Sequence, residues 1–85
     1  MFVIDDELHA EQMAESDSFG EAIEQLKDWS TVPWDQPPHR APCEGWRDCG
    51  RRYEIVEYDD KHVPWRELSR VHVLDVSKSG AQWLV

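Results

Sequence analysis

The residues of this chain best suited to bind a metal ion are two histidines and two cysteines: His39, Cys43, Cys49 and His62. Thiolate and imidazole are the usual ligands of tetrahedral zinc, and they occur in closely spaced pairs. The separation of His39 and Cys43 fits such a pair, but the separation of Cys43 and Cys49 is too long. We therefore expect no metal and no other cofactor, and we interpret both cysteines as small buried side chains.

Cys49 is the best candidate for a catalytic nucleophile, because Gly50, Arg51 and Arg52 follow it and nearby positive charge activates a thiol. The Cys-x5-Arg spacing of a phosphatase fails, since the sixth residue after Cys43 is Cys49. The sequence indicates no general base and no oxyanion site to accompany a nucleophile. We therefore predict that the protein is not an enzyme.

Basic and aromatic residues are interleaved in the same stretch, as in surfaces that stack nucleic-acid bases. They are Arg40, Arg47, Arg51 and Arg52 with Trp34, Trp46 and Tyr53. The arginines also have acidic neighbours, and an arginine fork binds a carboxylate as well as a phosphate. These neighbours are Asp35, Glu44, Asp48 and Glu54. We favour arginines that clamp the loop through ion pairs, and a zinc-binding or nucleic-acid-binding domain that uses residues 39–53 is the alternative.

The charge of the chain favours a protein partner. The net charge is −9, and residues 1–38 carry ten acidic residues against one basic residue, Lys27. Such a surface repels nucleic acid and anionic membranes and attracts basic protein surfaces. We predict a small acidic, non-enzymatic protein-binding module that acts as an inhibitor or regulator of a larger complex handling nucleic acids. Exposed strand edges also allow a homodimer formed by extension of the sheet.

The candidate partner-binding residues fall into two groups. One group lies in the central loop and contains Trp34, Arg40, Trp46, Arg47 and Arg51. The other lies on the predicted acidic helix and contains Glu21, Glu24 and Asp28.

The sequence predicts a cytoplasmic location. No apolar run approaches the roughly 18–20 residues that span a membrane. Acidic residues follow Phe2, Val3 and Ile4 at once, so the pattern does not indicate a signal peptide. We expect the cytoplasm of a bacterium, or of the host if a phage encodes the protein.

One helix is predicted over residues 19–30. Ser18 and Glu21 form a capping box, in which each side chain bonds the backbone amide of the other residue. Apolar residues then recur at helical spacing, which predicts a single buried stripe. They are Phe19, Ala22, Ile23, Leu26 and Trp29.

Strands are predicted on both sides of this helix. An N-terminal hairpin should pair residues 2–4 with 8–15 around a turn at 5–7. Further strands are expected at 51–58, 71–76 and 81–85, with an irregular connection at 59–69 that contains a helical turn at 65–68. The strand at 51–58 should be central because both its faces are apolar. The order ββαβββ predicts one α+β domain over residues 1–85, an antiparallel sheet with the helix packed on one face.

The stretch from Pro33 to Glu54 joins these two parts and contains both cysteines and four of the five prolines. It reads PW…PPHRAPC…WRDCGRRYE, and this block resembles a pattern in small uncharacterised bacterial proteins. The resemblance implies a single folded domain in which the loop joins a ββα unit to C-terminal strands, and it implies no activity. We expect the loop at 33–52 to be ordered, with Trp34 or Trp46 as its hydrophobic anchor.

Overall fold

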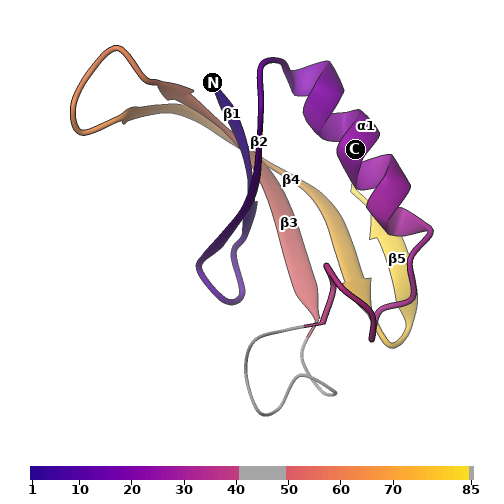
Figure 1. The fold of residues 1–85 in the computed structure, drawn as a ribbon. Helices are drawn as coiled ribbons and strands as arrows, with labels where there is room; N and C mark the ends of the chain where they lie inside the picture. Colours follow the sequence, from indigo (N-terminus) through magenta and orange to yellow (C-terminus); the bar gives the residue numbers. More distant parts are fainter. Residues whose placement is uncertain (41–49, 85) are drawn as a thin grey trace.

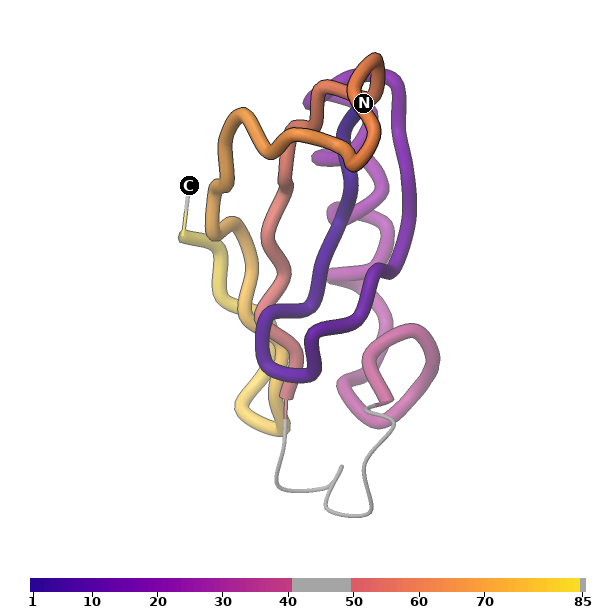
Figure 2. The backbone as a smooth tube through the Cα atoms, turned by 90° about the vertical axis from the view of Figure 1, so that its left-hand side faces the viewer, coloured from indigo at the N-terminus to yellow at the C-terminus, as the bar shows by residue number. Residues whose placement is uncertain are grey.

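The computed structural model describes residues 1–40 and 50–84, which form one helix and five strands (Figure 1). The elements are β1 (Phe2–Asp6), β2 (Glu11–Ser16), α1 (Phe19–Ser30), β3 (Arg51–Asp59), β4 (Arg66–Ser77) and β5 (Gly80–Trp83). All pairings are antiparallel, and the strands lie in the order β2-β1-β3-β4-β5. Figure 2 follows this order from β5 to β2, with α1 against one side. The predicted α+β fold and its ββαβββ order are confirmed.

The helix begins and ends where the sequence predicts. The Ser18 hydroxyl accepts a hydrogen bond from the Glu21 amide at 3.1 Å, which satisfies one of the free N–H groups of the first turn. The Glu21 carboxylate bonds the amide of Asp17 rather than that of Ser18. Ala22 and Leu26 are fully buried, so the apolar stripe faces the sheet. No helix in the described part of the chain is long and apolar enough to cross a membrane.

The core lies between α1 and the centre of the sheet. Ile4, Ile55 and Val71 are neighbours in register across β1, β3 and β4 and pack in the core. On the other face Val3 and Val56 are register partners and are also buried. Since paired residues share a face of the sheet, β3 is apolar on both faces. Its predicted central position is confirmed.

The first hairpin differs from the prediction. β1 continues through Asp5 and Asp6, the turn lies at residues 7–10, and β2 begins at Glu11 instead of residue 8. Ala10 adopts a positive φ of 50° at the end of this turn. Acidic residues are uncommon in strands, which favoured a turn at residues 5–7. Tertiary partners of the two aspartates, described below, explain why the strand continues.

The connection between β3 and β4 is also shorter than predicted. β3 extends to Asp59 and β4 starts at Arg66, so residues 66–69 form a strand and the predicted helical turn is wrong. Residues 66–70 are exposed and show no apolar pattern. Pairing with β3 defines this part of the strand, for example Glu57 with Ser69 and Asp59 with Arg66. The turn at residues 77–80 is confirmed, with Gly80 at a φ of 108°.

The start of β3 has a steric requirement for glycine. A Cβ atom at Gly50 would lie 2.4 Å from the carbonyl oxygen of Val76, which is backbone and cannot rotate away. We expect Gly50→Ala to lower the free energy of unfolding by about 1–3 kcal/mol, the usual cost of overpacking. Gly20→Ala is the matched control, because a Cβ atom there meets nothing closer than 3.9 Å.

In the helix, Gly20→Ala should raise stability by up to about 1 kcal/mol. Urea denaturation of both variants measures the two effects. A Gly50→Ala protein as stable as the wild type would contradict the close approach of Val76.

Candidate functional site

Arg51 lies at the start of β3 and is only 4% exposed. Its guanidinium donates to the carboxylates of Asp6 and Glu11, both at 2.8 Å. It also donates to the carbonyl oxygens of His39 at 3.1 Å and Arg40 at 2.9 Å. The predicted arginine clamp therefore exists here, but its acids come from the N-terminal hairpin rather than from the loop. Arg51 is committed inside the chain and does not present its charge to a partner, which corrects its assignment as a partner-binding residue.

Asp6 is the acidic partner at the centre of this cluster and is fully buried. Its two carboxylate oxygens accept from Arg51 and His9 and from the backbone amides of Leu8 and Arg52. Burial by itself would raise the pKa of Asp6, but these hydrogen bonds outweigh it, and the pKa lies below its usual value. Asp6 therefore remains ionised and joins β1, its turn and β3.

His39 is buried beside this cluster, with both ring nitrogens engaged. Nδ1 lies 2.9 Å from the Tyr53 hydroxyl, and Nε2 lies 2.5 Å from the carbonyl oxygen of Trp29. An imidazole that donates to the Trp29 carbonyl and accepts from Tyr53 satisfies both contacts in its neutral form. Burial lowers the pKa of His39, and the positive charge of Arg51 lowers it further. His39 thus attaches the loop to α1 and β3.

The four residues considered as candidate metal ligands do not all lie together, because His62 is far from His39. His62 is 62% exposed, pairs with Asp59 at 3.3 Å and follows the far end of β3. His39 contacts Tyr53 and His62 contacts Asp59, so six residues of β3 separate the two histidines by roughly 20 Å. Within residues 1–40 and 50–84, no three His, Cys, Asp or Glu residues are placed to hold a metal ion. Cys43 and Cys49 lie outside the described residues.

The remaining loop candidates divide between core and surface. Trp34 is partly buried and packs against the hydrophobic core, so its predicted role as an anchor is confirmed. Arg40 is exposed, and its backbone carbonyl is held by Arg51. Trp46 and Arg47 lie outside the described residues.

The acidic residues of α1 are exposed as predicted. Glu21, Glu24 and Asp28 recur at a spacing that places them on one outer face, away from buried Ala22 and Leu26. Glu24 pairs with Lys27 at 3.1 Å, and Glu21 bonds the backbone before the helix. This face is separate from the Arg51 cluster.

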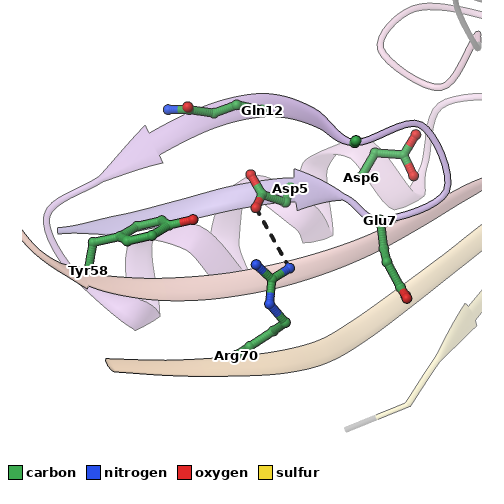
Figure 3. A pocket seen from close by; sticks show the side chains of 7 residues that line it. Asp5, Asp6, Glu7, Gln12, Tyr58 and Arg70 are labelled. Carbon is green, nitrogen blue, oxygen red and sulfur yellow. Dashed lines mark ion pairs between the residues drawn. The ribbon is translucent and has the colours of Figure 1, made fainter. Parts of the chain in front are cut away.

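The sequence did not reveal a polar pocket of about 410 Å³ on the face of the sheet opposite α1 (Figure 3). Asp5, Gln12, Tyr58 and Arg70 line it from four different strands. They meet because β1 and β3 bring residues far apart in the sequence into register. No local pattern in the sequence connects these residues.

Arg70 organises this pocket. Its guanidinium pairs with Glu54, with Glu67 at 2.8 Å and with Asp5 at 3.8 Å. The bonds to Glu67 and Glu54 raise the pKa of Arg70, and burial raises the pKa of Asp5 despite the opposing effect of Arg70. Glu54 was expected to pair with an arginine of the loop, and instead it pairs with Arg70. Since three carboxylates surround the one guanidinium, the pocket is a poor site for an anion.

The sequence predicted exposed strand edges but not their position, and the structure places one of them on β4. β5 pairs only with residues 74–77 of β4, and the last bond runs from the Leu84 amide to the Val73 carbonyl. Among the described residues, no strand pairs with the outer edge of β4 at residues 66–72, which we call the open edge. Figure 1 shows β4 continuing past β5 toward its turn with β3. The apolar side chains of Trp65, Leu68 and Leu84 are exposed around it.

The Arg51 cluster predicts a large loss of stability when its cation is removed. Arg51→Ala should lower the free energy of unfolding by about 3–5 kcal/mol, because buried Asp6 loses its charged partner. Arg52→Ala is the matched control, since its ion pairs with described residues are long, 3.6 and 3.7 Å, and its side chain is 41% exposed. Its effect should stay below about 1 kcal/mol. Equal losses in chemical denaturation would contradict the central role of Arg51.

His39 predicts a pH dependence of stability. Because its pKa is lowered on folding, the unfolded chain binds a proton more readily than the folded one. The free energy of unfolding should therefore fall as the pH drops below the ordinary histidine pKa of 6.5, until the folded-state pKa is passed. His39→Gln should remove this contribution to the slope. Denaturation at a series of pH values measures it, and identical slopes in wild type and His39→Gln would contradict the assignment.

Comparisons with models of protein families, with curated proteins and with solved structures found no match to this chain. The geometry described above is therefore the basis for a functional proposal.

Proposed function

We propose that this protein is a non-catalytic protein-binding module that receives an extended segment of a partner along the open edge of β4. The observation that carries the proposal is the uncovered stretch at residues 66–72. Every second residue of an edge strand directs its N–H and C=O groups outward, where another strand can satisfy them. Addition of a strand to such an edge is a common mode of peptide recognition.

The residues around the open edge support the proposal that it binds a partner chain. Natural sheets usually protect an edge with a short strand, a proline or an inward-pointing charge. Here β4 has twelve residues, its pairing with β3 shifts register opposite residues 67–69, and the charges of Glu67 and Arg70 pair with each other at 2.8 Å. Leu68, 55% exposed, lies between them. An extended edge with apolar side chains around it is suited to binding another chain.

The charge of the module supports the class of partner. The exposed acids of α1 and the net charge of −9 favour a basic protein surface. Proteins that handle nucleic acids carry basic surfaces of this kind. We therefore extend the proposal to an inhibitor or regulator of such a complex.

The proposal predicts that blocking the backbone of the open edge abolishes capture of the partner. In β3 the backbone groups of Arg52 and Tyr58 bond β1, so by alternation those of Glu54 do too, and its register partner His72 directs its N–H to the open side. His72→Pro removes this amide and adds a ring at the open edge, while His72→Ala leaves the backbone unchanged. In affinity capture from the source cells, wild type and His72→Ala should retain the same partner and His72→Pro should lose it. A folded His72→Pro protein that retains the partner would contradict the proposal.

Because a proline can also disturb pairing with β3, hydrogen exchange provides a second test on the wild-type protein. Outward amides among residues 66–72 should exchange fast in the free protein and slowly in the complex. Protection confined to other residues would place the interface elsewhere.

A further inference from the structure

We infer that the segment bound along the open edge is a basic strand with apolar residues at alternate positions, one of which enters the pocket between α1 and β5. This inference rests on the proposed function and adds the chemistry of the partner. Three observations support this inference. The two sides of the open edge indicate an alternating pattern, the pocket at its end indicates an apolar side chain, and the charge of α1 indicates a basic segment.

The two sides of the open edge differ in polarity. On the side of α1, Val71 shares a face with Ile4 and Ile55 and packs against the core. On the opposite side lie Arg70 and its carboxylates. Since side chains of a strand alternate between the two faces of a sheet, a strand added here contacts an apolar side and a polar side in turn. An alternating segment therefore fits this position.

An apolar pocket adjoins the end of the open edge. It has a volume of about 420 Å³ and is lined by Ile23, Lys27 and Ser30 of α1 and by Trp83 of β5. Trp83 is the register partner of Leu74, one residue before the last bond between β5 and β4. Its indole is 39% exposed. The pocket is large enough for one leucine or phenylalanine side chain and lies where the added strand would begin.

The charge beside the pocket selects a basic segment. Lys27 of the pocket pairs with Glu24 at 3.1 Å, and Asp28 is exposed on the same helix. Three carboxylates surround Arg70 on the other side of the edge. A second copy of this chain would bring another net charge of −9 to the interface, which opposes self-association through this edge. Lysine or arginine residues between the apolar positions complement the acidic surface instead.

The test uses a blocked peptide, Lys-Val-Lys-Leu-Lys-Val-Lys, titrated into the ¹⁵N-labelled full chain. We expect shifts of the amides at residues 66–72 and of the Trp83 indole. Replacing the peptide leucine by alanine should weaken binding about ten- to a hundredfold, as expected when burial of one apolar side chain is lost. Binding should also weaken as salt is added, because exposed charges are screened.

Two control peptides test the two parts of the inference. One has the same composition with its apolar residues adjacent, Lys-Lys-Val-Leu-Val-Lys-Lys, and the other has glutamate in place of each lysine. Equal binding of the first would overturn the alternating pattern, and equal binding of the second would overturn the basic character. Shifts at residues 66–72 that depend only on protein concentration would indicate a second copy and overturn the inference.

Failure of the inference can be distinguished from failure of the proposed function. If no peptide binds but the natural partner is still lost in His72→Pro, the edge binds a strand of another chemistry and only the inference is wrong. If the natural partner is retained by a folded His72→Pro protein, the proposed function itself is wrong.

Discussion

The buried ion pair between Arg51 and Asp6 is the interaction on which the rest of this structure depends. It joins residues 45 positions apart and reaches two carbonyl oxygens of the loop in the same cluster. The loss of hydration offsets much of the Coulomb attraction in a buried ion pair, so the pair adds little net stability. Its main effect is to fix the positions of the segments that it joins. Because Asp6 is held by Arg51, β1 continues as far as Asp6 and pairs with β3 in a single register. With the carbonyls of His39 and Arg40 fixed, the segment after α1 lies against the start of β3.

On the other face of the sheet, a second arginine, Arg70, also pairs with carboxylates from neighbouring strands. Arg70 connects β4 to Glu54 of β3 and to Asp5 of β1, so one guanidinium spans three neighbouring strands. This network restrains the part of β4 that β5 does not cover. A strand held in extended form before it meets a partner loses little conformational entropy on binding. The polar pocket and the open edge are therefore parts of one arrangement, in which the first stabilises the second.

Local signals in the sequence predicted those elements that local interactions define. The Ser18 cap and the stripe containing Ala22 and Leu26 placed α1, and the two apolar faces around Ile55 and Val56 placed β3 at the centre. The errors occurred where distant residues decide. Asp5 and Asp6 suggested a turn because acidic residues are uncommon in strands, and their partners Arg70 and Arg51, which hold them in β1, lie far along the chain. The start of β4 was missed because it has no apolar pattern and forms a strand through its pairing with β3. The position of the open edge could not be predicted for the same reason, since the whole sheet decides which strand is left uncovered.

The position of β1 between β2 and β3 has a consequence for the order of folding. β1 pairs with β2 across a short turn, but its other neighbour begins only at Arg51. Closing that long segment has an entropic cost that no contact offsets until the strands meet, and non-local pairing of this kind slows folding. The β1–β2 hairpin and the β3–β4–β5 unit can form early and separately, whereas the core between them requires their association. During synthesis, the N-terminal hairpin and helix therefore leave the ribosome with their apolar surfaces uncovered and remain dependent on a strand not yet made.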